Sequence, residues 1–521
     1  MNPRHQQHAF TDDAMGTLDA TGLAEALGQG HVSAPEVMAA SIARAERINP
    51  EINGIVTSDY VRAHERALRP PSGPFSGIPF LIKDNIPLAG LPTGFGSEAI
   101  DGKPARANNA VSRQLLAQGL IPLGKSTLPE FGFNASTEFA QRRPTVNPWH
   151  REYSAGASSG GSAAMVAAGV VPMAHANDGG GSIRIPAACC GLVGLKPSRG
   201  RLCDSEAARS LPINIIGEGV LTRTVRDTAA FYAHAERLHP ARGLPPIGPV
   251  QGPGRKRLRI ALVTDSINGS VTDRDTREVT ENTAHQLAQC GHGVETFSPD
   301  VDPRFPEDFT RYWAMLGFIV SHTGKITMAP SFQKRHVDNL TRGLERKFRQ
   351  EMHKLPGTLW RLRRSAQLYR QALKGFDAVL CPVVAHTTPK LGYLSPRLPF
   401  SVLFPRLEQY ASFTPMANAT GAPAIALPAG QTQEGLPIGV QLMAHHGQER
   451  LLLELAYELE AAAPWPFLWH SRQKAGDSAQ ARSASASQCA NRRAMGQANA
   501  LDPFRFTRDS ARARQIKWEN G

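Results

Sequence analysis

Apolar residues along the chain alternate between a helical spacing and short continuous runs. Ser33 and Glu36 have the spacing of a capping box, which predicts a helix that runs to about Ile48 and stops at the Asn49-Pro50 pair. A short apolar run at 78–83 predicts a buried strand soon afterwards. Because helix and strand signals take turns in this way, we expect an α/β core.

The same alternation continues after one interruption. A Pro- and Gly-rich stretch at 239–254 breaks the pattern and is the candidate internal linker. Beyond about residue 472, Ala, Ser, Gln and Arg dominate without a period, which is typical of a disordered tail. The other elements predicted from the pattern are strands at 170–176, 259–265, 377–384, 422–430 and 439–444, and helices at 274–290 and 449–462.

The formal net charge of +13 is concentrated in two segments. Residues 334–374 hold twelve Lys or Arg against three acids, and residues 471–521 hold ten against four, so the rest of the chain is close to neutral. A solvated helix face and a basic tail explain this distribution better than a nucleic-acid groove does. We therefore expect no nucleic-acid partner.

The overall composition indicates an ordinary soluble protein, with 521 residues, 41% hydrophobic and 20% charged. The six cysteines have neither paired spacing nor a metal-ligand pattern, which favours reduced thiols in a cytoplasm. No apolar run approaches the roughly 18 residues of a membrane span, and the first thirty residues lack the apolar core of a signal peptide. We expect a cytoplasmic protein with no membrane partner and no metal.

A phosphate-loop expression, G-x-x-x-x-G-K-S, is matched in full at 119–126. Its surroundings argue against nucleotide binding, because a helical pattern precedes it and Pro122 removes a backbone donor. The S-x-x-K pattern at 331–334 recurs at 471–474, as expected of so short a pattern by chance.

The stretch 156–160 matches the nucleophile elbow G-x-S-x-G of α/β-hydrolase-type esterases, with Ser158 as the nucleophile. His175 and Asp178 could complete a Ser-His-Asp set in sequence. The elbow requires a strand directly before it, whereas 146–155 is predicted to be a loop. We expect His175 to be a strand residue whose ring is hydrogen-bonded.

A run of three glycines that ends in a serine suggests a different chemistry. Successive N–H groups in such a loop can converge on an oxyanion beside the Ser182 hydroxyl, whereas a tight turn explains only one or two of the glycines. Lys83, at the end of an apolar strand, can act as a base only if burial lowers its pKa by about three units. Composition alone favours an exposed lysine there. Asp84 is expected on the opposite face of the strand.

Three separated motifs, in order, resemble the amidase signature family. They are GIPFLIKDN at 77–85, GASSGGSAAMVAAG at 156–169 and NDGGGSIRIPAACCGLVGLKPSRGR at 177–201. The resemblance continues through GKSTLPEFGFNAS, TPMANATGAPAIALPAG and GLPIGVQLMA. It implies an α/β fold with one large domain at 17–470, built on a central mixed twisted sheet flanked by helices on both sides. An N-terminal extension would occupy 1–16, and the basic tail 471–521.

The resemblance also implies the site residues and a reaction without cofactors. Carried over position by position, it makes Ser182 the nucleophile, Ser158 the bridging serine after a cis peptide bond from Ala157, and Lys83 the base. Ser159 would support this network. The oxyanion hole would be formed by the N–H groups of Gly179, Gly180, Gly181 and Ser182.

These residues imply an amidase that hydrolyses a carboxamide, or a linear or cyclic amide, through an acyl-enzyme on Ser182. Ala157 stands where many relatives have Gly, and the stretch before Ser182 differs from the TDTGGS of amidotransferase A subunits. This form of the motif is more similar to that of free-standing bacterial amidases, including 6-aminohexanoate cyclic-dimer hydrolases. Two alternatives remain at this point, the A subunit of a tRNA-dependent amidotransferase and an esterase that uses Ser158. The expected partner is a small-molecule amide, and a homodimer is a candidate assembly.

Overall fold

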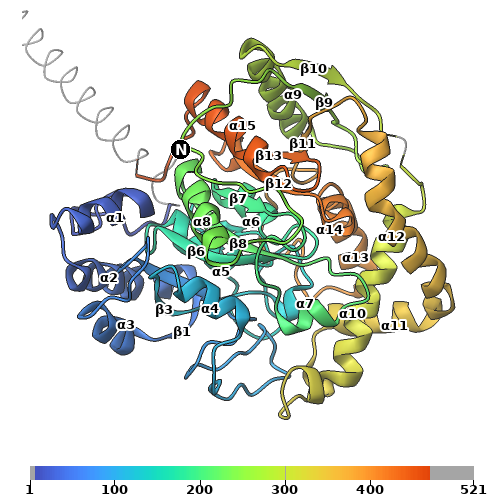
Figure 1. Ribbon diagram of the computed structural model, residues 1–521. Coiled ribbons are helices and arrows are strands. Elements are labelled where there is room, and N and C mark those ends of the chain that lie inside the picture. The colour runs from blue at the N-terminus through green and yellow to red at the C-terminus, as the bar shows by residue number, and fades with distance from the viewer. Residues whose placement is uncertain (1–5, 300, 470–521) are drawn as a thin grey trace, which may run out of the picture. The chain divides into compact units, whose positions relative to one another are not determined.

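The computed structural model describes residues 6–299 and 301–469, which belong to one compact unit (Figure 1). The predicted tail at 471–521 lies outside the described residues. Within the described residues, an eleven-stranded sheet has the order β1-β3-β2-β6-β8-β7-β12-β13-β11-β9-β10. The strands of this sheet are β1 Ile55–Ser58, β2 Pro79–Lys83, β3 Ile121–Ser126, β6 Met173–Asp178, β7 Val193–Lys196, β8 Gly217–Thr222, β9 Arg259–Leu262, β10 Gly293–Thr296, β11 Ala378–Pro382, β12 Ala424–Gln431 and β13 Pro437–Ala444.

The sheet is mixed, as the resemblance implies. β2 pairs in parallel with β3 and β6, and β9 pairs in parallel with β10 and β11. The central pairs β6–β8, β8–β7, β7–β12, β12–β13 and β13–β11 are antiparallel. A separate two-stranded sheet is formed by β4 Val146–Asn147 and β5 His150–Ser154.

Helices cover both faces of the sheet. Successive side chains of a strand point to opposite sides, so a strand of apolar residues gives each face of the sheet side chains that pack against helices. On β2, Leu81 belongs to the apolar cluster that contains α5 and α6, whereas Phe80 and Ile82 belong to the cluster that contains α8 and α15. The helices are α1 Ala20–Gly28, α2 Ala34–Ile52, α3 Tyr60–Ala67, α4 Ala110–Leu116, α5 Gly160–Ala167, α6 Arg184–Cys190, α7 Glu206–Ser210, α8 Val225–Leu238, α9 Arg274–Gln289, α10 Phe305–Thr327, α11 Asn339–Glu351, α12 Leu355–Ala372, α13 Phe400–Tyr410, α14 Pro415–Thr420 and α15 Glu449–Ala462.

The capping box at Ser33 is confirmed, but the predicted end of its helix is wrong. The Ser33 side chain accepts from the Glu36 N–H while Glu36 bonds back to Ser33, and the helix then continues through Pro50 to Ile52. It ends where Asn53 adopts a left-handed conformation with φ 58°. A proline in the last turn therefore does not stop this helix. The left-handed residue that follows does.

The other predicted elements are found, the helix at 449–462 with the predicted bounds and the others with shifted boundaries. The strand expected at 170–176 lies at Met173–Asp178, because residues 169–172 form the turn after α5. The stretch 239–254 contains no helix or strand and joins α8 to β9 within the same compact unit. Residues 6–16, predicted as an extension, lie against that unit, where the Arg44 guanidinium bonds Asp13 and the Ala9 N–H donates to Ala168 O.

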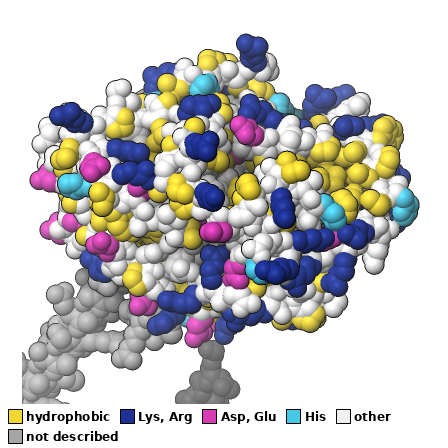
Figure 2. Space-filling model, turned by 90° about the horizontal axis from the view of Figure 1, so that it is seen from below, with side chains coloured by type: hydrophobic (Ala, Val, Ile, Leu, Met, Phe, Trp, Pro, Cys, Tyr) yellow, Lys and Arg dark blue, Asp and Glu magenta, His cyan; other side chains and the backbone are white. Residues whose placement is uncertain are grey.

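The basic segment 334–374 forms two short 3₁₀ turns together with α11 and α12. Several of its cations are paired within the segment, as Lys334 and Arg349 are with Glu345. On the face drawn in Figure 2, Lys and Arg side chains are spread over most of the surface, with acidic side chains scattered among them. Among the described helices, none combines the length and the apolarity needed to cross a membrane.

Candidate active site

Lys83 ends strand β2 and its side chain is fully buried, so the exposed lysine that composition favours is not what forms. Its Nζ donates to Ser158 Oγ at 2.7 Å and to Asn177 Oδ1 at 2.7 Å. Burial lowers the pKa of Lys83 to about 7, although the carboxylates of Glu218 and Asp178 act in the opposite direction. A substantial fraction of this amine is therefore uncharged near neutral pH.

Asp84 does not pair with Lys83, as the alternation of strand side chains predicts. Its carboxylate instead accepts from Lys125 Nζ of the neighbouring strand β3 at 3.0 Å, and both side chains are buried. This pairing leaves the amine of Lys83 with neutral partners. It also removes Lys125 from any role as a free cation.

The two short motifs that suggested other chemistries do not form sites. The phosphate-loop match at 119–126 contains the whole of β3, which pairs with β1 and β2, so its backbone is part of the sheet. At 331–334, Ser331 bonds Asp101 O while Lys334 pairs with Glu345. The two side chains of the S-x-x-K match thus engage different partners.

Ser158 lies in a tight segment between β5 and α5, and the Ala157–Ser158 peptide bond is cis, as the resemblance implies. Gly156 precedes it with φ 73°, and a Cβ there would lie 2.7 Å from the Cα of Pro186. The conformation and the close approach both require glycine at this position. On the other side, a Cβ on Gly132 would lie 3.0 Å from Ser158 Oγ. Small residues thus allow the backbone to close around this hydroxyl.

Ser182 joins the same site through its backbone and lies half-buried on the lining of the cavity that Ser158 also lines. The Ser159 N–H donates to Ser182 O at 3.3 Å, and Ser159 Oγ lies 3.4 Å from Asn177 O. Within the described residues, the Ser182 hydroxyl has no hydrogen-bond partner. The structure therefore places Ser158 and Ser182 on the lining of one cavity, with Lys83 in direct contact with Ser158.

The glycine run offers fewer free N–H groups than the resemblance implies. The Gly181 N–H donates to Asp178 Oδ1 at 2.7 Å and is therefore already engaged. The N–H groups of Gly179, Gly180 and Ser182 donate to no acceptor in the part of the chain that the structure describes. Three of the four predicted donors remain available to a ligand.

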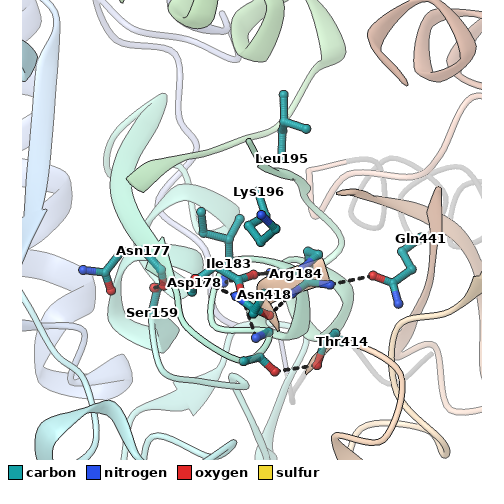
Figure 3. A network of polar contacts seen from close by, with 12 residues as sticks. Ser159, Asn177, Asp178, Ile183, Arg184, Leu195, Lys196, Thr414, Asn418 and Gln441 are labelled. Carbon is teal, nitrogen blue, oxygen red and sulfur yellow. Dashed lines mark hydrogen bonds and ion pairs between the residues drawn. The ribbon is translucent and has the colours of Figure 1, made fainter. Parts of the chain in front are cut away.

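The carboxylate of Asp178, which the sequence suggested only as a member of a Ser-His-Asp set, holds this loop in place (Figure 3). Arg184 binds it with two nitrogens, at 2.9 and 3.0 Å, and Asn418 Nδ2 donates to it at 2.9 Å. Burial by itself would raise the pKa of Asp178, but Arg184 and Asn418 outweigh it and hold that pKa well below its usual range. Thr414 adds a bond to Gly180 O at 2.6 Å.

The sequence contains a signal for this network. Asp178 and Arg184 are opposite charges in the stretch 178–195, which contains no other charged residue, and buried charges in proteins are normally paired. Asn418 and Thr414 come from the motif TPMANATG, far away in sequence. Their contribution depends on tertiary contact.

His175 is hydrogen-bonded on strand β6, as predicted. Its Nδ1 accepts from the Lys83 N–H at 3.3 Å and its Nε2 lies 3.0 Å from Glu218 Oε2. The loop predicted at 146–155 is wrong, because β4 and β5 form a two-stranded hairpin there, outside the main sheet. In the described residues Ser158 contacts Lys83 and no histidine, so the Ser-His-Asp set of the esterase alternative does not form.

The serines open into a cavity of about 740 Å³. Its walls near Ser158 and Ser182 are Phe131 and Ile185, and α10 and α13 complete it farther out. The segment after 300 thus contributes much of the lining of the pocket. Among the described residues no cluster of His, Cys, Asp or Glu has the arrangement of a metal site.

Comparisons with known proteins identify the family of the chain. The amidase family model matches residues 36–453. AmiC of Mycobacterium leprae is 49% identical over 459 residues, which cover 88% of this chain and 98% of that protein. The 6-aminohexanoate-cyclic-dimer hydrolase of Paenarthrobacter ureafaciens is 32% identical over 479 residues, covering 86% of this chain and 95% of the relative. A solved structure of a 6-aminohexanoate cyclic dimer hydrolase is 30% identical with a TM-score of 0.79, over 87% of this chain and 98% of that one. The chain belongs to the amidase signature family.

Proposed function

We propose that this chain hydrolyses a carboxamide, or a linear or cyclic amide, to a carboxylate and an amine or ammonia through an acyl-enzyme on Ser182. The single observation that carries the proposal is the 2.7 Å hydrogen bond between Lys83 Nζ and Ser158 Oγ. Burial that lowers the pKa of Lys83 to about 7 supplies an amine able to accept a proton near neutral pH.

The first step is attack by Ser182 Oγ on the carbonyl carbon of the amide. The Ser182 proton passes to Ser158 Oγ as the proton of Ser158 passes to Lys83 Nζ, so no hydroxyl is left charged. The carbonyl oxygen becomes negative and is stabilised by the N–H groups of Gly179, Gly180 and Ser182. Gly181 has a different task in this scheme, because its N–H ties the loop to Asp178.

Collapse of the tetrahedral intermediate breaks the C–N bond. The leaving nitrogen takes a proton from Lys83 by the reverse route through Ser158, which restores the neutral amine. Water then attacks the acyl-enzyme, gives its proton to the same relay and releases the carboxylate, with Ser182 recovering its own proton.

A panel of substrates determines which amides the protein accepts. The name of the relative from Paenarthrobacter ureafaciens states hydrolysis of a cyclic dimer, which supports including cyclic diamides. We propose testing purified protein on aliphatic amides, aryl amides, cyclic diamides and esters. The preferred class is the one with the highest kcat/KM.

The decisive experiment removes the proposed nucleophile. Ser182→Ala is expected to lower kcat by about 10⁴-fold or more and to abolish labelling by a fluorophosphonate. Ser210→Ala, which changes an exposed serine on α7, is the matched control and should behave like the unchanged protein. Substantial turnover by Ser182→Ala with the same substrate would contradict the proposal.

The amidotransferase alternative has one observation in its favour, the basic segment 334–374. Three of its cations, Lys334, Lys347 and Arg349, are paired with acids of the same segment, which weakens it as an RNA surface. Salt-sensitive binding of tRNA together with inactivity of the isolated chain on all amides of the panel would favour this alternative.

A further inference from the structure

A second cavity of about 640 Å³ lies on the opposite side of the first turns of α10 from the catalytic cavity. We call it the α12 chamber, because one face of α12, from Trp360 to Leu373 just beyond its end, lines it together with the segment that follows β9 and with β11, β13 and α14. Ile267, Phe305 and Ser412 line both cavities and form the wall between them. Its volume is in the range typical of small-molecule sites. None of the proposed catalytic residues lines it.

The interior of the α12 chamber is apolar. Leu373, Cys381 and Met443 are buried side chains of its lining. Ser365 Oγ and Tyr369 OH are already bonded, since Ser365 Oγ donates to Leu362 O and Tyr369 OH lies 3.3 Å from Ala444 O. The buried Ser412 Oγ, on the wall shared with the catalytic cavity, is a neutral hydroxyl without a partner among the described residues. A ligand that enters must therefore present a mainly apolar body, because a single neutral hydroxyl does not replace the hydration that a charged group would lose.

The mouth of the chamber combines exposed apolar side chains with one uncompensated cation. Trp360 and Leu368 are 57% and 39% exposed and lie on the same face of α12, two turns apart. Between them, the Arg364 guanidinium lies over the Trp360 ring, 4.5 Å from its centroid. An arginine on an aromatic platform keeps its donors free for a planar anion.

The acids around the chamber do not neutralise Arg364. Asp302 pairs with Arg304, Asp308 with Arg361, and Asp265 with Arg277. Within the described residues, Arg364 has no carboxylate within ion-pair distance. The lining therefore carries one positive charge without a partner, at the end where the chamber meets solvent.

We infer that the α12 chamber is a second ligand site, which binds an apolar molecule ending in one carboxylate, with the apolar body inside and the carboxylate on Arg364. This site is separate from the proposed hydrolysis, so it holds or fails independently of the role of Ser182. Saturated fatty carboxylates from hexanoate to decanoate have this chemistry and serve as probes.

The first test measures binding of hexanoate, octanoate and decanoate to the full chain by calorimetry. Each added methylene should tighten binding about fourfold, which corresponds to about 0.8 kcal/mol per buried CH₂. Ala372→Phe fills the chamber and should abolish binding. Ala366→Phe makes the same change on α12 at a residue outside the lining and should leave binding intact. Equal loss in both variants, or no binding at all, would overturn the inference.

The second test concerns the charge. Arg364→Gln should weaken decanoate binding about tenfold, whereas Arg370→Gln, an exposed arginine of α12 outside the lining, should not. Decanol, which has no charge, should bind more weakly than decanoate and be indifferent to Arg364→Gln. Decanol that binds as tightly as decanoate would refute the inference that Arg364 binds the carboxylate of the ligand.

The third test separates the chamber from the catalytic cavity. Decanoate that inhibits hydrolysis competitively, with the same inhibition constant in Ala372→Phe as in the unchanged protein, would place the carboxylate in the catalytic cavity instead. That result would overturn the inference while leaving the proposed hydrolysis untouched.

Discussion

Two lysines on adjacent parallel strands, Lys83 of β2 and Lys125 of β3, are both fully buried and have different surroundings. Lys125 forms an ion pair with Asp84, whereas Lys83 donates to the neutral oxygens of Ser158 and Asn177. Burial lowers the pKa of both amines, and only for Lys125 does a carboxylate in direct contact oppose it. Burial is therefore common to the two sites. The hydrogen-bond partner decides which lysine can serve as a base.

The register of the strands accounts for the difference. Ile82 faces Lys125 across the β2–β3 pair, and Lys83 faces Ser126. Since side chains alternate along a strand, Lys83 and Lys125 point to opposite sides, and Asp84 follows Ile82 to the side of Lys125. Lys83 lies one position after the residue that faces Lys125. It therefore points to the other side of the sheet, where no carboxylate of the described residues pairs with it.

Replacing the proposed base should have the largest effect. Lys83→Met is expected to lower kcat by about 10⁴-fold, because no other amine of the described residues contacts Ser158. The unchanged protein should lose kcat/KM below pH 7 as Lys83 takes up a proton near its pKa of about 7. A pH-rate profile and the kcat of the variant check both statements. Wild-type turnover by Lys83→Met would remove Lys83 from the mechanism.

The same lysine makes a stability prediction. The folded protein releases the Lys83 proton near pH 7, whereas the unfolded chain holds it to about pH 10.5, so unfolding takes up a proton between these values. The free energy of unfolding should therefore rise with pH in this window, by at most about 1.4 kcal/mol per pH unit, relative to Lys83→Met. Urea denaturation of the two proteins at pH 7 and pH 9 measures the difference. A difference independent of pH would contradict the lowered pKa.

Lys125→Met should affect folding rather than chemistry. It leaves the buried Asp84 carboxylate without its partner, which is expected to lower the free energy of unfolding by about 3 to 5 kcal/mol. Asp84→Asn combined with Lys125→Met removes both charges and should recover most of this loss. The stability of single and double variants by urea denaturation, with kcat of the folded fraction, distinguishes the two lysines. Loss of kcat without loss of stability would break the comparison.

Asn177→Asp tests the comparison directly by giving Lys83 a carboxylate partner like that of Lys125. An opposite charge at this distance should raise the pKa of Lys83 and move the acidic limb of the pH-rate profile up by about 1 to 3 pH units. Asn268→Asp adds the same charge to the lining of the same cavity but does not contact Lys83. Its profile should be unchanged. An unmoved limb in Asn177→Asp would mean that another group sets the profile.

The smallest effect is expected from Ser159→Ala. Its hydroxyl makes a long contact with Asn177 O, so the loss in kcat should stay within about tenfold. Ser162→Ala on α5 is the control, because that hydroxyl bonds Ser126 and His175 O instead. It should change stability more than kcat. A 10³-fold loss in Ser159→Ala would indicate a direct catalytic part for Ser159.

Local sequence patterns predicted which helices and strands form better than they predicted where these elements begin and end. The capping box at Ser33 acts within one turn of helix and was readable, whereas the end of that helix depends on Asn53 and on contacts of its side chain with the chain beyond. The hairpin at 146–154 was missed because its polar residues lack the alternation of a half-buried strand.

The motifs of the chain indicated by themselves the family, the α/β architecture and the candidate residues of the site, because residue type and order are local properties. Only the tertiary structure decided which polar atom faces each amine, that Asp178 already occupies the Gly181 N–H, and that α10 separates two cavities. These depend on strand register and on helices distant in sequence, and a buried charge responds to every group packed against it. The chemistry of Lys83 is thus encoded in its neighbours, most of which lie far from it along the chain.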